Sequence, residues 1–251
     1  MTRIRWAAAL LLAVLPAAAG CGATSAPVAA EPPAPQPSRA AVAPARAPKI
    51  TYPARGRAQW WTAPASARTG GSRGRLLRYR VRVERDIRGL ALTGFADAVS
   101  AALDDPRGWT AGGALRLRRS GLGQPYDFTI YLATPRTRDA LCGSAGDAYT
   151  SCRNGDKVVL NVARWVKGVS GYGAPLSVYR QYMVNHEVGH RLGHGHERCP
   201  GKGLPAPVMQ QQTLGLHGCT AYPWPYRSGR RYAGASGAYP DPLPAPERAR
   251  R

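Results

Sequence analysis

The segment at residues 186–196, which reads HEVGHRLGHGH, constrains the fold more than any other part of the chain. It contains the pattern H-E-x-x-H as His186, Glu187 and His190. Side chains four positions apart share one face of an α-helix, so both imidazoles can bind one metal ion if this segment is helical. Glu187 lies about 100° around the helix axis from His186, beside the metal rather than on it. The pattern therefore predicts a helix with a metal at its surface.

A third histidine extends this pattern to H-E-x-x-H-x-x-G-x-x-H. Gly193 can adopt a positive φ and end the helix, after which the chain can turn back and present His196 as a third ligand. His194 is the alternative if the helix continues, but a second glycine at position 195 argues against continuation. Three imidazoles leave a fourth position for water, which is typical of catalytic zinc, whereas structural zinc is usually closed by four protein ligands. We predict one catalytic zinc ion per chain, held by His186, His190 and His196.

The segment resembles the zinc signature of the metzincin clan of metallopeptidases. A further mark of that clan is a methionine in a tight turn beneath the metal, and Met209 lies thirteen residues past His196. The order of upstream strands and helices extends the likeness over about 75–220, and more narrowly the chain is similar to a secreted metzincin-like family of actinobacteria. The resemblance implies a peptidase fold whose edge strand pairs with an extended substrate. The chain departs from the astacin branch at Gln211, where astacins carry a tyrosine that can reach the metal.

The residue types favour zinc-dependent hydrolysis, and the resemblance implies a peptide or protein substrate. Zinc would polarise a water molecule and the scissile carbonyl, and Glu187 would take the proton of the water as general base. A zinc-dependent amidase acting on other substrates uses the same chemistry and stays open. A non-catalytic, envelope-binding lipoprotein is the third interpretation, and it is disfavoured because Glu187 serves chemistry rather than the fold.

The charge of the chain suggests polyanionic partners of low specificity. Lys and Arg number 35 against 14 Asp and Glu, a net charge of +21. Residues 73–226 carry +10 of this and the remaining residues carry +11, so more than half lies in segments predicted to be unstructured. We expect diffuse attraction to an anionic cell envelope and no specific nucleic-acid site. A nuclease is also disfavoured because the sequence has no Asp/Glu-rich cluster for two metal ions.

The N-terminus predicts export. Arg3 and Arg5 precede an apolar run over residues 6–15, and small residues follow, which is the order of a secretion signal over residues 1–20. Cys21 comes next, as in a bacterial lipoprotein, so we predict a cell-surface lipoprotein whose only membrane attachment is a lipid on Cys21. The alternative is ordinary cleavage that leaves an extracellular protein.

The cysteines are consistent with export. The chain has five, and assigning Cys21 to a lipid leaves four, which permits three disulfide connectivities. We favour the pairing in which each bridge closes one short loop, Cys142 with Cys152 and Cys199 with Cys219.

Composition divides the chain into parts. Residues 26–48 contain seven Pro and nine Ala, which is typical of an extended spacer without a core. We predict a signal peptide at 1–20, a Pro/Ala-rich linker at 21–72, a catalytic domain at 73–226 and a basic flexible tail at 227–251.

Hydrophobic periodicity predicts an α+β fold. Alternating apolar residues indicate a strand near 77–83, and an apolar face at helical spacing indicates a helix over 91–104. The remaining predicted elements are strands at 114–119, 127–133 and 157–162, an edge strand at 146–151, and a helix at 176–192. We expect a metzincin-like domain with a mixed twisted sheet plus two helices, one of them the active-site helix, and an irregular C-terminal subdomain.

Overall fold

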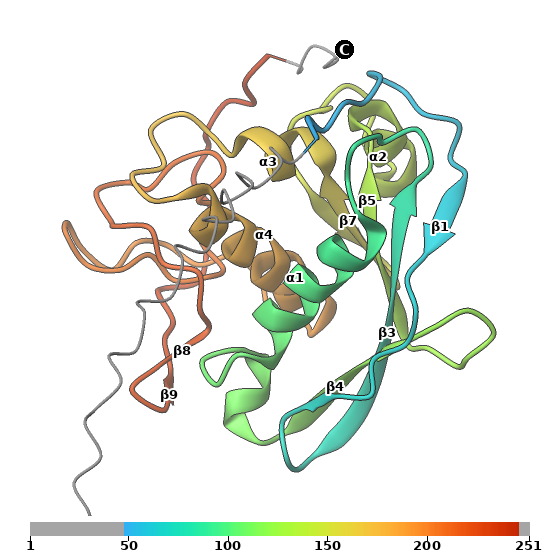
Figure 1. Ribbon diagram of the computed structural model, residues 1–251. Helices are drawn as coiled ribbons and strands as arrows, with labels where there is room; N and C mark the ends of the chain where they lie inside the picture. Colours follow the sequence, from blue (N-terminus) through green and yellow to red (C-terminus); the bar gives the residue numbers. More distant parts are fainter. Residues whose placement is uncertain (1–47, 246–251) are drawn as a thin grey trace, which may run out of the picture. The chain divides into compact units, whose positions relative to one another are not determined.

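The computed structural model describes residues 48–245 and is built around a mixed sheet of seven strands (Figure 1). The strand order is β2-β4-β3-β5-β7-β6, and β1 pairs with β3 beside this path. The central strands β3, β4, β5 and β7 are parallel, whereas β1, β2 and β6 join them antiparallel. The strands are β1 (Trp60–Thr62), β2 (Thr69–Gly70), β3 (Arg75–Glu84), β4 (Leu115–Ser120), β5 (Phe128–Ala133), β6 (Cys152–Asn154) and β7 (Lys157–Asn161). The predicted signal peptide and Cys21 lie outside the described residues.

Four α-helices accompany the sheet in residues 48–245, which confirms the α+β class. They are α1 (Leu92–Asp104), α2 (Pro135–Cys142), α3 (Val162–Lys167) and α4 (Leu176–Arg191), and a 3-10 turn, η1, spans Trp109–Gly112. The helices α1 and α4 lie against each other on one face of the sheet (Figure 1). Their apolar sides meet alternate residues of the strands, such as Tyr79 and Val81 of β3, in one buried core. The residues that alternate with these along the strands point to the other face of the sheet. They include Tyr131 and Val159, which pack near α2.

Two short helices were absent from the prediction, which expected two helices in all. The helix α2 begins with Pro135, one residue after β5 ends, so its first residues resemble a turn. The helix α3 follows β7 without a break, and the side chain of Asn161 caps it by accepting a hydrogen bond from the backbone amide of Ala163 at 2.9 Å. The predicted strand at 157–162 therefore ends one residue early, and helix begins there.

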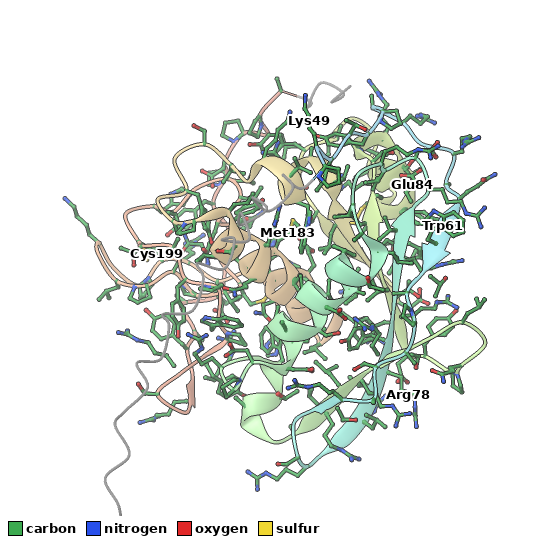
Figure 2. The ribbon with its side chains drawn as sticks, in the orientation of Figure 1. Lys49, Trp61, Arg78, Glu84, Met183 and Cys199 are labelled. Atoms are coloured by element: carbon green, nitrogen blue, oxygen red, sulfur yellow. A yellow bond between two sulfur atoms is a disulfide. The ribbon has the colours of Figure 1, made fainter. Side chains whose placement is uncertain are left out.

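The predicted linker is wrong for residues 48–72, which belong to the folded unit. The strands β1 and β2 lie in this segment, and Trp60 packs edge-on against Tyr131 of β5. The fully buried carboxylate of Glu84 joins the segment to the sheet, because it accepts hydrogen bonds from the backbone amides of Ala58 at 3.0 Å and Thr134 at 2.7 Å (Figure 2). Residues 48–72 contain few aliphatic residues, so their sequence did not indicate that they form an edge of the sheet.

The predicted edge strand at 146–151 is also wrong, since the edge strand is β6 at Cys152–Asn154. The side chain of Asp147 accepts hydrogen bonds from the backbone amides of Tyr149 and Thr150, at 3.0 and 2.9 Å. Those amides are therefore turned toward Asp147 instead of a neighbouring strand. The strand β6 pairs antiparallel with β7 and forms the edge of the sheet nearest α4.

Both predicted disulfides are confirmed: Cys142 is bonded to Cys152 and Cys199 to Cys219. The first joins the end of α2 to β6, and the second closes a loop in the C-terminal part. Among the described residues, no helix has the length and hydrophobicity needed to cross a membrane.

The chain after α4 is irregular, as predicted, apart from a hairpin of β8 (Tyr226–Arg227) and β9 (Arg230–Arg231). The predicted flexible tail is wrong for residues 227–245, which pack on this region. Arg231 forms an ion pair with Glu197 at 2.7 Å, and the backbone amide of Gly237 donates to the carbonyl of His196 at 2.9 Å. These contacts hold the segment that carries the third histidine of the motif.

Candidate metal centre

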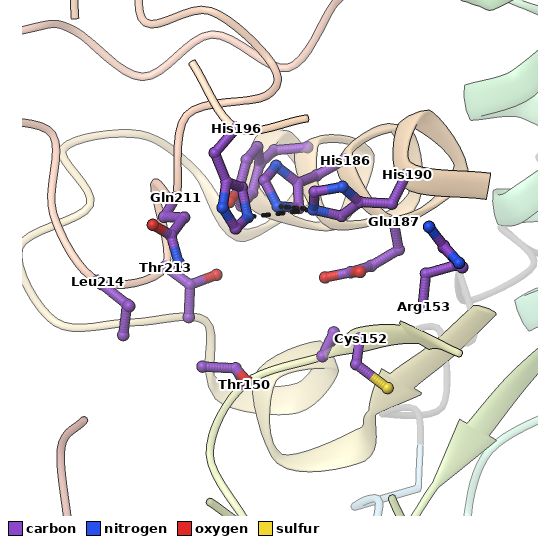
Figure 3. Close-up of a pocket in the computed structure, with 12 residues that line it drawn as sticks. Thr150, Cys152, Arg153, His186, Glu187, His190, His196, Gln211, Thr213 and Leu214 are labelled. Carbon is purple, nitrogen blue, oxygen red and sulfur yellow. Dashed lines mark hydrogen bonds between the residues drawn. The ribbon is translucent and has the colours of Figure 1, made fainter. Parts of the chain in front are cut away.

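The three histidines of the motif converge in space, as the sequence predicted. The Nε2 atom of His190 lies 3.2 Å from that of His186 and 3.1 Å from that of His196 (Figure 3). The first two side chains come from adjacent turns of α4, and the third comes from the loop after it. Within residues 48–245, these three are the only group of histidine, cysteine or acidic residues whose ligand atoms are close enough to hold a metal ion.

Backbone carbonyls fix which nitrogen of two rings carries the proton. The Nδ1 atom of His186 lies 2.8 Å from the carbonyl oxygen of Val208, and that of His190 lies 2.9 Å from the carbonyl oxygen of His194. A carbonyl oxygen only accepts, so each Nδ1 must donate, and in the neutral ring Nε2 then has a free lone pair. Two lone pairs face each other at 3.2 Å without a proton between them. A cation between these nitrogen atoms would remove their repulsion.

The electrostatic environment keeps these rings neutral. Burial, followed by the neighbouring His190, places the pKa of His186 well below its usual value, and the same two causes lower the pKa of His196 to about 4. Burial also lowers the pKa of His190. The rings are therefore unprotonated at neutral pH, which is the form that binds metals.

The turn after α4 brings the third histidine into place. Gly193 has a φ of 95°, a left-handed conformation that ends the helix, and the backbone amide of His194 returns to the carbonyl of Gly189 at 3.0 Å. The side chain of His194 points away from the cluster and stacks on Trp109, with ring centroids 4.4 Å apart. The structure therefore brings His196, not His194, to the other two rings.

Glu187 is buried beside the histidines. Its side chain lines the same pocket and extends toward the wall formed by Thr150 and Cys152 (Figure 3). Its Oε2 atom is buried without a hydrogen-bond partner, and burial raises the pKa of the carboxyl group to about 8. A buried carboxylate that lacks partners is costly, so its position is best explained by a ligand in the pocket.

The pocket, of about 320 Å³, lies between α4, β6 and the segment after Met209. One wall is formed by residues 150–153 and the facing wall by residues 211–214. The first wall is held from behind by Arg138, a buried residue of α2, which forms an ion pair with Asp147 at 2.7 Å and donates to the Thr150 hydroxyl at 2.8 Å. A rigid wall therefore faces the histidines across the pocket.

Met209 lies in a tight turn beneath α4. The turn is closed by a hydrogen bond from the backbone amide of Gln210 to the carbonyl of Pro207 at 3.0 Å. Met209 is fully buried, and the carbonyl before it, that of Val208, is the acceptor for His186. The turn therefore both packs under the helix and orients one histidine.

We expect Gly189→Ala to destabilise the domain by about 1–3 kcal/mol, the usual cost of overpacking a well-packed core. A Cβ atom on Gly189 would lie 2.4 Å from the Met209 sulfur and 2.6 Å from Cζ2 of Trp109. Gly195→Ala is the matched control, because its Cβ would meet nothing within 4 Å. Chemical unfolding of both variants tests this, and equal stability would contradict the packing of Met209 against the helix.

The donor set fits zinc. Three nitrogen ligands at the usual zinc–nitrogen distance in a tetrahedral site are separated by roughly 3.3 Å. The observed separations of 3.1 and 3.2 Å agree with that value. The hydrogen bonds from Nδ1 of His186 and His190 to backbone carbonyls also match the partners that zinc-binding histidines usually have.

Residues 47–226 match a family described as "Protein of unknown function (DUF3152)". The chain belongs to this family. The DUF3152 region contains the three histidines, Glu187 and both walls of the pocket. No curated protein and no solved structure matches the chain.

Sequence reasoning missed several residues that shape this DUF3152 site. Trp109 donates from its indole nitrogen to the carbonyl of Asn185 at 2.8 Å and packs under the helix beside the motif, but nothing in its sequence context indicated this. Arg153 lines the pocket, and its position next to Cys152 was the available signal. Tyr222 and Tyr226, the nearest tyrosines past the turn methionine, are not among the described residues that line the pocket.

Proposed function

We propose that this protein is a zinc-dependent hydrolase that cuts peptide bonds. The observation that carries the proposal is the convergence of three neutral imidazoles next to a buried, unpartnered carboxylate in a pocket beside the edge strand β6. This combination serves no purpose in a packing core, where charged and polar groups are paired.

Each residue has a defined part in the proposed reaction. His186, His190 and His196 would hold zinc, which when bound acts as a Lewis acid toward water and a carbonyl oxygen. Glu187 would accept the proton of the attacking water and deliver it to the leaving amine. Burial raises the pKa of this carboxyl group, which favours its holding the proton between the two steps. The backbone of β6 would orient an extended substrate by strand pairing.

The metzincin relationship is part of this proposal. It is supported by the glycine turn that presents the third histidine, by the tight turn with Met209 beneath α4, and by the mixed sheet with an edge strand at the pocket. Met209 would serve as the Met-turn of that clan. Gln211 lines the pocket where the astacin branch has a tyrosine, so we propose no protein ligand beyond the three histidines.

We also propose that the domain works outside the cytoplasm. The two disulfides support this location because such bonds persist in oxidising compartments. A lipid on Cys21 would hold the domain at the cell surface, and the net charge of +21 would favour contact with an anionic envelope.

The test is a digest of a randomised peptide library by the purified chain. We expect cleavage with zinc and none after removal of zinc by a chelator, with recovery when zinc is added back. Mass spectrometry of the products identifies the cut bonds. If the zinc-loaded protein cuts no peptide but hydrolyses simple acyl amides, the function is that of an amidase instead.

A further inference from the structure

The pocket has one charged end. Of the described residues that line it, Arg153 is the only one with a permanent positive charge, and Glu187 is the only acid. The far wall presents uncharged side chains, Gln211, Thr213 and Leu214. A ligand in this pocket therefore meets both charged side chains, Arg153 and Glu187, on one side of the histidines and neutral groups on the other.

The sheet register directs Arg153 into the pocket. Arg153 pairs with Val158 of β7, and Val158 is buried in the core on the helix side of the sheet. Cross-strand partners project to the same face, so the Arg153 side chain extends toward α4. Figure 3 shows it beside Glu187 and His190. The position of Arg153 follows from the pairing of β6 with β7 and does not depend on a mobile loop.

Both neighbours of Arg153 are anchored to α2. Cys152 is bonded to Cys142, and the side-chain amide of Asn154 donates to the carbonyl of Leu141 at 3.0 Å. The backbone at Arg153 is thus fixed on either side, whereas its guanidinium is free. Arg153 itself is exposed, whereas the buried Arg138 is paired with Asp147 and the half-buried Arg231 with Glu197. Arg153 takes part in none of the ion pairs of residues 48–245.

We propose that Arg153 is a specificity residue that binds a carboxylate of the substrate, so that the protein selects acidic peptides. This inference rests on the proposed peptidase function. The carboxylate belongs to an Asp or Glu side chain, or to a free C-terminus. It lies in the part of the substrate that is next to Arg153 when the scissile bond is at the histidines. A guanidinium is suited to this role because its planar fork of donors matches a carboxylate.

The experiment compares the full-length protein with Arg153→Ala and Arg153→Glu on two peptide libraries, one with free and one with amidated C-termini. We expect the wild type to cut next to an acidic residue or a free C-terminus, always on the same side of the bond. Arg153→Ala should lower cleavage of those peptides by about 10- to 100-fold, the range for losing a hydrogen bond to a charged group. Arg153→Glu should shift the preference to Lys and Arg. The two libraries distinguish a side-chain carboxylate from a terminal one.

Arg118→Glu is the matched control. Arg118 is exposed on β4, pairs with Arg78 on the sheet face away from α4, and does not line the pocket. Cleavage without an acidic preference, or a preference that Arg153→Glu leaves unchanged, overturns the inference but leaves the peptidase intact.

A binding measurement separates the two proposals further. Fluorescence anisotropy with an Asp/Glu-rich peptide on metal-free protein needs no turnover. We expect weaker binding for Arg153→Ala than for Arg118→Glu. Equal losses in the two variants overturn the inference, because attraction by net charge would then suffice. If no peptide is cut by any protein while Arg153-dependent binding persists, the peptidase proposal fails and the acidic-ligand site stands.

Discussion

Glu187→Gln is expected to abolish hydrolysis while the protein keeps its fold and its zinc. Glutamine has nearly the same shape as glutamate, but it cannot accept the proton of the attacking water. Loss of a general base lowers the rate by about 10²–10⁴-fold. Because Glu187 is one residue past His186 on the helix, it is not on the ligand face and its replacement leaves all three imidazoles in place. Metal content and turnover of a peptide substrate, measured on the same preparation, check the prediction.

A second effect of the same substitution follows from burial. Burial raises the pKa of Glu187 to about 8, so at neutral pH the metal-free protein must take up a proton on this carboxyl group when it folds, and a neutral amide avoids that cost. We therefore expect stability of the metal-free variant at neutral pH to be unchanged or higher. Asp156→Asn is the control, since Asp156 is exposed in the turn between β6 and β7 and does not line the pocket. Wild-type turnover by Glu187→Gln would show that Glu187 is not the base.

The convergence of the three histidines could be predicted, because helical geometry relates two of them directly. His186 and His190 are four residues apart, and the structure places their Nε2 atoms 3.2 Å apart on one face of α4. The position of His196 needed one further inference, that Gly193 ends the helix, and its φ of 95° confirms this. The strands of the core were also predictable, because β3 and β5 alternate or concentrate apolar residues over several positions.

The environment of the ligands could not be predicted, since it depends on contacts between distant segments. The acceptor for His186 is a backbone carbonyl 22 residues away, at Val208, and any residue type can supply one. The position of Arg153 in the pocket depends on its register with Val158. Short edge elements were missed for a related reason. The strand β1 has only three residues, which is too short to show a periodicity. Contacts of its segment with β3 and with Glu84 hold it in place instead.

The largest expected effect on metal binding comes from the histidines themselves. His196→Ala should lose stoichiometric zinc and, with it, hydrolysis. Removal of one of three imidazoles leaves two ligands from α4, which hold zinc far more weakly. His196 is the most informative of the three, because it is half-exposed and its ring makes no hydrogen bond to the backbone of the described residues. His186→Ala, by contrast, would also leave the Val208 carbonyl unpaired in a buried site, so that loss of zinc and loss of fold would be confounded.

His194→Ala is the matched control, since its ring stacks on Trp109 outside the cluster while its backbone carbonyl, which alanine retains, orients His190. Zinc bound to the native state only should raise the free energy of unfolding by about 4 kcal/mol at a thousandfold excess over Kd. We expect that stabilisation in the wild type and in His194→Ala, and little of it in His196→Ala. If His196→Ala binds one zinc as tightly as the wild type, the third ligand lies elsewhere. If His194→Ala alone loses the metal, the turn at Gly193 must rearrange when zinc binds. Because unfolding reports binding without any substrate, the result does not depend on the proposed hydrolysis.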